Sequence, residues 1–480
     1  MVWYRIGTVA TAARGKQEWI YVAFESRATQ EDGVCADTLP RSGRLVSKQM
    51  WNESKTSAIA AQRRVDNLVE WDLRKLTQAE PTNRSSTPSV VGKVGCAVSV
   101  VIPARNAQDF LRRCLAHLNR STDCRFEVIV VDDASSDATS NVAEELGARV
   151  IRLATRSGPA AARNRGTVEA REDILVFVDA DVLVQPDTIG RLADRLKHDC
   201  DAVFGSYDVH PTAPNLVSQY KNLLHHFVHQ QASRQAGTFW AGCGAILASK
   251  FAEVGGFSET YHRPCIEDIE LGVRLKNRGY RIELDPDIQV THLKHWTFKT
   301  MLWADVFDRA LPWTQLILEQ GAIPNDLNLK TSQRICAVLA LAAAIVCTCI
   351  ASLRELSLLL LPLGSGFALL VADAVGMRAS HVRFAERSGA ILLVGVFAIF
   401  ALKLPFVTGL LSAMLMGIVI LNQSLFRFFF RHRGLAFTIL SLPLQVLYYC
   451  YSSMAFGWAC TRYGLRRIWG WFRKLTCPRK

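Results

Sequence analysis

The apolar residues of this 480-residue chain fall into two patterns, and the change comes near residue 330. Before that point they form short runs rich in valine and isoleucine. From Ile335 onward they form long segments with few charged residues. Short β-branched runs are typical of strands, whereas long apolar segments are typical of buried or membrane-spanning helices. At least two structural regions of different kinds are therefore expected.

The first pattern predicts an α/β domain. Four runs, AVSVVIPARN, FEVIVVDDAS, ARVIRL and DILVFVDAD, are separated by stretches expected to be helical, such as 109–119 and 140–146. Strands alternating with helices indicate a βαβ series, with a parallel sheet covered on both faces. Nearly continuous valine, isoleucine and leucine in each run suits strands that are buried on both sides.

Acidic residues follow two of these strands. In open α/β sheets, ligands bind beyond the carboxyl ends of the strands, where Asp132, Asp133, Asp179 and Asp181 are expected. Two carboxylates one residue apart can reach for one hard cation, and oxygen ligands suit Mg²⁺ or Mn²⁺ shared with a diphosphate. The triplet Asp179-Ala180-Asp181 alone is equally compatible with a polar turn at the end of a strand.

Two further motifs favour a catalytic site. RSGPAAARNRG at 156–166 combines a turn of small residues with Arg163, a side chain suited to phosphate. CIEDIELGVRLKNRGY at 265–280 places Glu267 and Asp268 at the start of an amphipathic helix. Acidic residues in a first helical turn often only complement the helix dipole. These two motifs indicate a catalytic site only in combination with the acidic sheet edge.

Taken together and in this order, six motifs resemble the family 2 glycosyltransferases, whose catalytic domain has the GT-A fold. They are VSVVIPARN, VIVVDDASSDAT, GPAAARNRG, VFVDADV, FWAGCGAILASKFAEVGGFSE and EDIELGVRL, and they extend over about 98–300. The resemblance implies a Rossmann-like mixed sheet, a nucleotide-diphosphate sugar donor, a divalent Mg²⁺ or Mn²⁺ ion and inversion at the anomeric carbon.

The resemblance also implies roles for individual residues. Asp133 would accept a hydrogen bond from the nucleotide base, Asp268 would be the general base, and Arg105 stands where the family commonly has a tyrosine. By position, the implied donor site is Pro103, Asn106, Asp132, Asp133, Arg163 and Asp179; the metal site is Asp179, Asp181 and His292; the catalytic carboxylates are Asp268 and Glu267; and the acceptor side is Trp240 and Gly242. Outside this family, a strand-end histidine such as His292 is more often a packing or surface residue.

The chemistry of transfer agrees with this set. A metal ion neutralises the charge on a departing nucleoside diphosphate, and a positioned carboxylate activates the acceptor hydroxyl. Processive polymer synthases of the family carry Gln-x-x-Arg-Trp after the Glu-Asp pair, whereas this chain has DVFDRALPWTQL. We therefore expect transfer of a single sugar, with processive polysaccharide synthesis as an alternative.

The second pattern predicts a membrane region over 333–460. Apolar segments at 335–353, 356–374, 389–402, 404–424 and 434–459 approach the length of a bilayer crossing, although a buried helical domain is the alternative. Arginine-rich breaks at 378–387 and 427–433, and the basic tail at 461–480, favour the cytoplasmic side. All three can lie there only if Pro443 bends the last segment. A net charge of +13 with 50% hydrophobic residues fits basic membrane edges better than nucleic-acid binding.

The sequence is less informative over residues 1–94 and 301–332. Residues 1–94 are polar and are expected to form a poorly ordered extension without a signal peptide. The stretch 301–332 is expected to form interfacial helices, with Trp296, Trp303 and Trp313 near lipid headgroups, or else ordinary packing helices. The resulting hypothesis is a multi-pass inner-membrane enzyme with a cytoplasmic catalytic domain and a lipid or lipid-linked acceptor. The alternative from another class is a lipid or glycolipid translocation protein whose soluble domain regulates it.

Overall fold

The computed structural model describes residues 6–8, 22–24, 97–198, 200–321, 325–352 and 405–476. The chain divides into two units, Met1–Glu70 and Trp71–Lys480. Within the first unit, the described residues form an antiparallel pair of strands, β1 (Ile6–Thr8) and β2 (Val22–Phe24). The rest of the expected extension over 1–94 lies outside the described residues. So do the apolar segments at 356–374 and 389–402.

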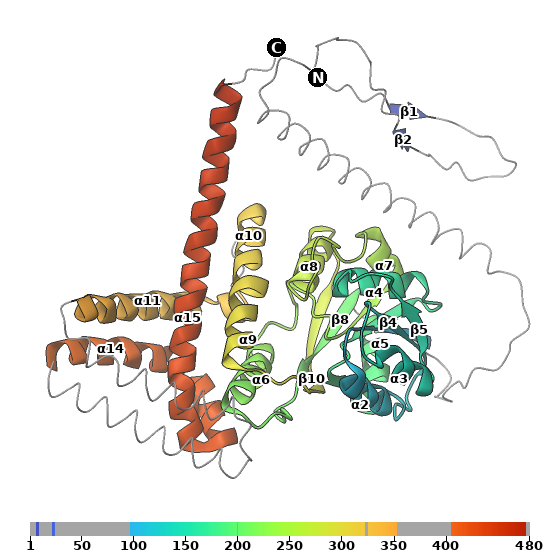
Figure 1. Cartoon of the computed structure of the whole chain (residues 1–480), viewed down its shortest axis with the longest axis horizontal. Coiled ribbons are helices and arrows are strands. Elements are labelled where there is room, and N and C mark those ends of the chain that lie inside the picture. The colour runs from blue at the N-terminus through green and yellow to red at the C-terminus, as the bar shows by residue number, and fades with distance from the viewer. Residues whose placement is uncertain are drawn as a thin grey trace, which may run out of the picture. The chain divides into compact units, whose positions relative to one another are not determined.

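The second unit is built on an eight-stranded sheet with the order β5-β4-β3-β6-β9-β8-β10-β7 (Figure 1). Strands β3 to β6 pair in parallel, β8 pairs in parallel with β10, and β9 and β7 run antiparallel to their neighbours. The expected α/β class with a mixed, GT-A-type sheet is confirmed. The strands are β3 (Ala97–Ala104), β4 (Arg125–Asp132), β5 (Arg149–Arg152), β6 (Ile174–Val178), β7 (Val182–Leu183), β8 (Ala202–Tyr207), β9 (Cys243–Leu247) and β10 (Ile282–His292).

Helices cover both faces of the sheet, and the alternation of side chains along each strand explains how. Val100 of β3 belongs to one buried cluster and its neighbour Val101 to the other, since successive strand residues point to opposite faces. The first cluster includes residues of α2 and α5, and the second includes residues of α4, α7 and α8. These helices are α2 (Gln108–Leu118), α3 (Thr139–Glu145), α4 (Pro159–Val168), α5 (Thr188–His198), α7 (Ala248–Glu253) and α8 (Glu267–Asn277).

The chain after β10 is helical. It comprises α9 (Phe298–Trp303), the π-helix η1 (Ala304–Ala310), α10 (Leu311–Gln320), the 3₁₀ turn η2 (Leu327–Leu329), α11 (Thr331–Ser352), α14 (Pro405–Leu421) and α15 (Gln423–Thr476). In the described part of the chain, Thr331–Thr348 and Gln423–Trp469 are long and apolar enough to cross a bilayer, and Gly409–Leu421 is a shorter apolar helix. Length and composition alone give weak support for membrane association.

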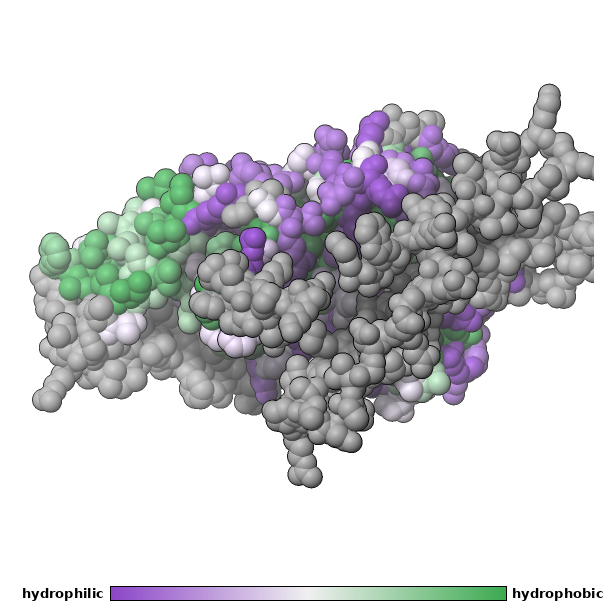
Figure 2. Space-filling model, turned by 90° about the horizontal axis from the view of Figure 1, so that it is seen from above, coloured by the Kyte–Doolittle hydropathy of each residue, from purple (hydrophilic) through white to green (hydrophobic). Residues whose placement is uncertain are grey.

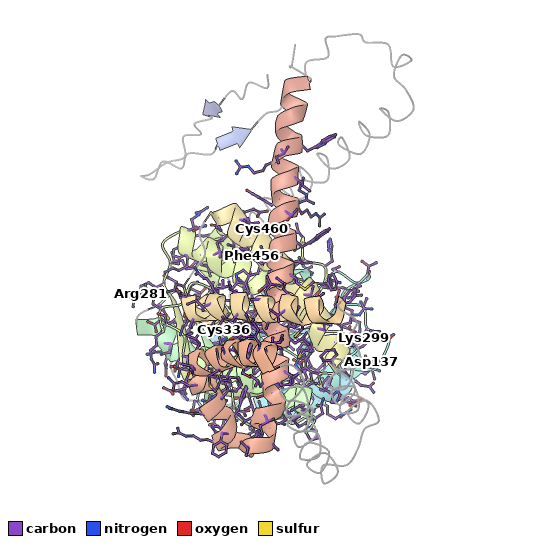
Figure 3. All side chains as sticks on the ribbon, turned by 90° about the vertical axis from the view of Figure 1, so that its left-hand side faces the viewer. Asp137, Arg281, Lys299, Cys336, Phe456 and Cys460 are labelled. Carbon is purple, nitrogen blue, oxygen red and sulfur yellow. The ribbon has the colours of Figure 1, made fainter. Side chains whose placement is uncertain are left out.

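The three long C-terminal helices pack on one another. α11 and α14 lie beside each other and both contact α15; in Figure 3, Cys336 marks α11, and Phe456 and Cys460 mark α15. α11 and α14 expose apolar side chains, with Val338 68% and Phe406 85% exposed, and Figure 2 shows a hydrophobic surface gathered at one end of the view. Within α15 the backbone leaves helical geometry at Gly434, whose φ is +82°, and not at Pro443. Glycine adopts this conformation without a steric penalty.

Helix α6 (Leu216–Gln230) connects the sheet to these helices. Tyr220 and Leu223 of α6 pack with Phe429 and Phe437 of α15 in one buried cluster. Trp296 belongs to the same cluster and is only 4% exposed, so its expected place at the headgroup level is wrong. The segment is held at α6 because Ser218 of this helix and Asn215 just before it donate hydrogen bonds to the Trp296 carbonyl. Trp303 is 50% exposed.

Candidate active site

The acidic edge predicted from the sequence is formed by the ends of neighbouring strands. Ala104 of β3 lies opposite Asp132 of β4, and β6, which pairs with β3, ends just before Asp179. Asp132 is buried and accepts hydrogen bonds from the Ser135 backbone N–H at 2.9 Å and from the Ser140 hydroxyl. Asp132 therefore fixes the turn that leads into α3.

Asp133 holds a second loop in place. Its two oxygens accept hydrogen bonds from the backbone N–H groups of Ser157 at 2.5 Å and Gly158 at 2.9 Å. Gly158 has φ +92°, and a Cβ there would lie 2.5 Å from the carbonyl carbon of His262. The loop before α4 can therefore approach the 258–266 segment only with glycine at this position.

The loop predicted to surround a nucleotide base is also interlocked. Asn106, with φ +47°, accepts hydrogen bonds from Ser136, the shorter from its N–H at 2.8 Å, and donates its own N–H to the Ser135 hydroxyl at 2.9 Å. Pro103 lies opposite Val131 in the β3–β4 register. The structure thus brings Pro103 and Asn106 to the same corner as Asp133, and Arg105 is exposed there.

Arg163 lies at the centre of the site as a buried cation. It donates to Asp179 Oδ1 at 2.6 Å and to Glu267 Oε1 at 2.9 Å, and its guanidinium carbon is 5.4 Å from the centroid of the Phe257 ring. Burial alone would lower the pKa of Arg163, but Asp179 and Glu267 outweigh it and raise that pKa. In this arrangement Arg163 neutralises two protein carboxylates, a role that the phosphate prediction did not anticipate.

Glu267 and Asp268 begin α8 but have different surroundings. Glu267 is 4% exposed, and its oxygens accept from Arg163 and from the Cys265 backbone N–H at 2.8 Å. Asp268 is partly exposed and accepts only from backbone N–H groups, those of Ala241 at 3.2 Å and Ile269 at 2.8 Å. Burial and the neighbouring Glu267 raise the pKa of Asp268 to about 7. Of the two, Asp268 is the more exposed, and a carboxyl group with a pKa of about 7 can exchange a proton near neutral pH.

Asp181 and His292 meet across the β7–β10 pair. His292 Nε2 lies 3.5 Å from Asp181 Oδ2, while His292 Nδ1 lies 2.7 Å from Asn222 Oδ1. An amide oxygen only accepts, so Nδ1 carries a proton. Burial would raise the pKa of Asp181, but His292 and Lys294 outweigh it and lower that pKa to about 2. An ionised carboxylate thus faces the second imidazole nitrogen.

This pair fits two ligands of a divalent cation. With Nδ1 bonded to Asn222 Oδ1, the Nε2 atom of His292 faces the carboxylate, where either a proton or a metal ion can stand between the two groups. A separation of 3.5 Å is long for an N–H···O hydrogen bond. Asp179 is turned toward Arg163. Within the described residues, the side chains accordingly form no group of three or more His, Cys, Asp or Glu that could hold a metal ion.

Trp240 and Gly242, which were predicted to line the acceptor side, lie next to Asp179, Tyr207 and helix α6. The Gly242 carbonyl accepts the Asp179 N–H at 3.2 Å, and a Cβ at Gly242 would lie 2.6 Å from the Trp240 ring. Trp240 packs against Tyr207, with ring centroids 4.8 Å apart, and against His225 and His229 of α6. Sequence reasoning missed these α6 and β8 residues; the histidine-rich run LLHHFVHQ was the one available signal.

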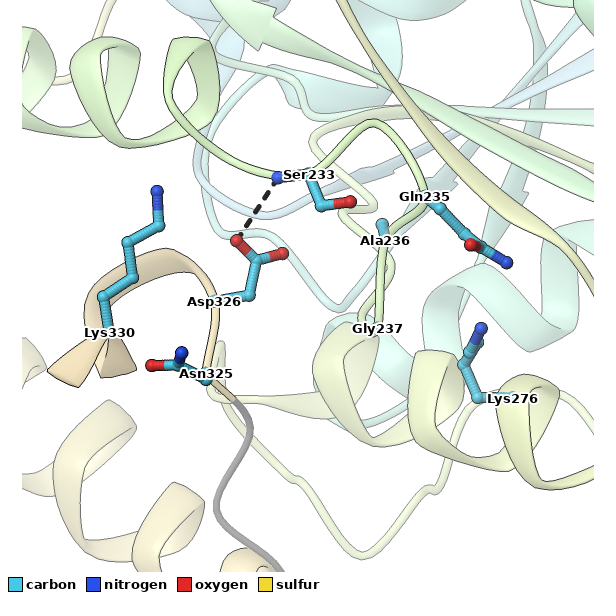
Figure 4. A pocket seen from close by; sticks show the side chains of 8 residues that line it. All are labelled: Ser233, Gln235, Ala236, Gly237, Lys276, Asn325, Asp326 and Lys330. Atoms are coloured by element: carbon cyan, nitrogen blue, oxygen red, sulfur yellow. Dashed lines mark hydrogen bonds between the residues drawn. The ribbon is translucent and has the colours of Figure 1, made fainter.

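A separate pocket lies between the loop after α6, α8 and the segment before α11 (Figure 4). Its lining contains none of the site residues predicted from the sequence. The Ser233 N–H donates to Asp326 Oδ1 across it at 3.3 Å. The lining residues are Ser233, Gln235, Ala236, Gly237, Lys276, Asn325, Asp326 and Lys330.

Two family models and several curated proteins match this chain. Residues 99–255 match the model of Glycosyl transferase family 2, and residues 222–296 match that of the N-terminal domain of galactosyltransferase. A pre-mycofactocin glycosyltransferase of Mycobacterium tuberculosis is 32% identical over 213 residues, which cover 41% of this chain and 42% of the relative. A dolichol-phosphate mannosyltransferase of Pyrococcus furiosus is 34% identical over 114 residues, covering 23% of this chain and 32% of the relative.

The chain thus spans less than half the length of these relatives. A solved mannosyltransferase from Pyrobaculum calidifontis is 19% identical and covers 77% of this chain and 98% of its own, with a TM-score of 0.38, too low to support an inference. The family 2 match contains the acidic strand ends and Asp181, whereas Asp268 and His292 lie within the 222–296 match. The chain therefore carries a family 2 glycosyltransferase domain over residues 99–255.

Proposed function

We propose that this chain transfers a single sugar, with inversion, from a nucleotide-diphosphate sugar to a hydroxyl of a lipid or lipid-linked acceptor at the cytoplasmic side of a membrane. The observation that carries the proposal is the gathering of Asp268, Trp240 and the Asp181–His292 pair at one edge of the glycosyltransferase domain. Apolar helices follow this domain and contact it directly through α6.

Asp268 acts as the general base. Both of its oxygens accept from backbone N–H groups, which fixes the carboxylate while leaving lone pairs for an acceptor hydroxyl. With a pKa of about 7, Asp268 can accept a proton from the acceptor hydroxyl near neutral pH. Glu267 is placed behind it, ion-paired to Arg163, and acts by keeping Asp268 basic and in position. Attack from the base's side on the anomeric carbon, opposite the leaving group, inverts that carbon.

The donor's diphosphate is placed near Asp179, Asp181 and His292. A divalent Mg²⁺ or Mn²⁺ ion bound there would neutralise the charge of the departing nucleoside diphosphate. Asp181 and His292 would hold the ion, with Asp179 beside them. Asp133, Asn106 and Pro103 would shape the base end of the donor site, because they lie at the paired ends of β3 and β4, where the Asp133 N–H donates to the Ala104 carbonyl.

The acceptor is proposed to come from the bilayer. Trp303 and Phe307 are exposed at 50% and 44% on the helices that follow β10, and they pack against each other with ring centroids 4.5 Å apart. This aromatic pair suits the headgroup level of a membrane. The relative named for dolichol phosphate provides a precedent for a lipid-linked acceptor.

The test is a screen of nucleotide sugars with the purified full chain in lipid nanodiscs. We expect metal-dependent release of the nucleoside diphosphate from one donor, and a glycosylated lipid in mass spectra of membranes that contain the chain. The Asp268→Asn variant is the matched control and should give neither product. Release of no nucleoside diphosphate from any donor, combined with lipid flipping in vesicles, would refute the proposal in favour of translocation.

A further inference from the structure

The interaction between Asn222 and His292 has no part in the mechanism above. Asn222 lies on α6 and His292 at the end of β10, and their side chains meet at 2.7 Å with both residues buried. Tyr207 stacks on the same imidazole, with ring centroids 4.3 Å apart and an interplanar angle of 12°. The imidazole is therefore held in its plane by Tyr207 and in its rotation by Asn222.

The direction of this hydrogen bond determines which ring nitrogen of His292 carries the proton and which one faces Asp181. Since Asn222 Oδ1 accepts, the Nδ1 proton is fixed on the side away from Asp181, and the Nε2 lone pair faces Asp181 Oδ2. Histidines that bind metal ions commonly donate the other ring nitrogen to a carbonyl or carboxylate oxygen, which sets the tautomer. Without an acceptor at Nδ1, the proton could move to Nε2 and occupy the position of the ion.

Helix α6 can hold Asn222 rigidly because its other side is anchored. Tyr220 donates to Gln445 Oε1 of α15 at 2.7 Å, and Arg433 of α15 donates to Gln219 Oε1 at 2.6 Å. Lys221 forms a buried ion pair with Asp305 of η1. Three successive residues of α6 are thus tied to the C-terminal helices immediately before Asn222.

We propose that Asn222 is a positioning residue that fixes the tautomer and orientation of His292 for a divalent cation shared with Asp181. This inference rests on the proposed function only in assuming that His292 binds such an ion. The proposal adds to the metal site a residue that lies outside the six sequence motifs. This residue, Asn222, belongs to helix α6, which α15 holds in position.

The experiment measures Mn²⁺ binding by the full chain in detergent, using electron paramagnetic resonance of free Mn²⁺, without donor or turnover. Asn222→Leu should raise the Mn²⁺ dissociation constant by about 10- to 100-fold, the usual effect of removing a hydrogen-bond partner of a metal ligand. Asn222→Asp keeps a hydrogen-bond acceptor for His292 Nδ1. Its Mn²⁺ dissociation constant should therefore stay within a few-fold of the wild-type value, even if its thermal stability falls.

A matched control separates positioning from folding. Asn215 is a buried asparagine at the start of the same helix that donates to the Trp296 carbonyl and does not contact His292. Asn215→Leu should lower the melting temperature without changing Mn²⁺ affinity. Asn222→Leu that binds Mn²⁺ as tightly as the wild type would overturn the proposal and leave the proposed function standing. A wild-type chain that binds Mn²⁺ neither alone nor with a nucleoside diphosphate present would refute both this proposal and the metal requirement, and sugar transfer would then be judged by the donor screen.

Discussion

Arg163 donates a hydrogen bond to Glu267 at 2.9 Å in a part of the site where both side chains are only 5% exposed. The same guanidinium also neutralises Asp179 at 2.6 Å. Replacing Arg163 by methionine would leave two carboxylates without their cation. Loss of one member of a buried ion pair typically costs about 3–5 kcal/mol of unfolding free energy.

Arg163→Met should therefore lower the unfolding free energy by an amount of this order, which a lower midpoint of chemical unfolding in detergent would show. Arg165→Met on the same helix is the control, since Arg165 is 46% exposed and pairs with Glu169 on the surface, an interaction worth about 0–1 kcal/mol. Equal midpoints for the two variants would show that Arg163 does not have the structural role described here.

Asp268 and Glu267 should respond differently to removal of charge. Asp268→Asn should lower the rate of sugar transfer by about 10²–10⁴-fold, the contribution of a positioned general base, with little change in stability. Glu267→Gln should lower stability, because it weakens the buried pair with Arg163. Transfer rates, donor dissociation constants and melting temperatures of both variants would be compared. Asp268→Asn with full activity would refute its assignment as the base.

The pH dependence of transfer follows from the pKa of Asp268. Burial and Glu267 raise this pKa to about 7, and a general base works only when deprotonated. The value of kcat/KM should therefore fall about tenfold per pH unit below pH 7 and level off above it. A profile measured at constant ionic strength from about pH 5.5 to 8.5 would test this, provided that a thermal scan shows the protein folded throughout. A flat profile over this range would contradict it.

Local patterns were sufficient to predict the parallel strands β3, β4, β5 and β6 and their acidic edge. Valine-rich runs that end in Asp132 and Asp179 require buried parallel strands whose carboxyl ends align, and the β3, β4 and β6 pairings show that alignment. Helices 109–119 and 140–146 were predicted to within one residue of α2 and α3. These features depend on short-range periodicity, which a single sequence displays directly.

Contacts between side chains that are far apart in the sequence could not be predicted from local patterns. Arg163 and Glu267 are 104 residues apart, and Asn222 and His292 are 70 residues apart, so no local spacing signals either contact. The phosphate prediction for Arg163 followed from its side-chain chemistry and from the family resemblance, and a guanidinium suits a protein carboxylate equally well. The assignments of the donor, metal and acceptor residues remain predictions for the experiments above.

Gly158 is expected to be irreplaceable for a steric reason. Its φ is +92°, and an added Cβ would lie 2.5 Å from the carbonyl carbon of His262, whereas Gly147, with φ +81°, has nothing within 4 Å. Gly147→Ala should cost about 1–2 kcal/mol for the left-handed backbone alone. Gly158→Ala should cost more and should also weaken donor binding, since the Gly158 N–H holds Asp133. Calorimetry with candidate nucleoside diphosphates would measure this; similar values for the two variants would rule out a steric role.

The ion pair between Lys221 and Asp305 joins α6 to η1 inside the protein, with side-chain exposures of 11% and 4%. Asp305 also accepts from the Tyr451 hydroxyl of α15 at 2.6 Å, so the pair connects the catalytic domain to the C-terminal helices. Lys221→Met would leave a buried carboxylate and should destabilise the fold by about 3–5 kcal/mol.

The double variant Lys221→Met with Asp305→Leu removes both charges and should recover most of this loss, because an apolar pair of similar volume often replaces a buried ion pair at little cost. Melting temperatures of the single and double variants in detergent form the test. A double variant less stable than Lys221→Met would show that Asp305 stabilises the junction mainly through Tyr451. Recovery would show that the junction between α6, η1 and α15 is maintained by packing, with the ion pair adding specificity of alignment.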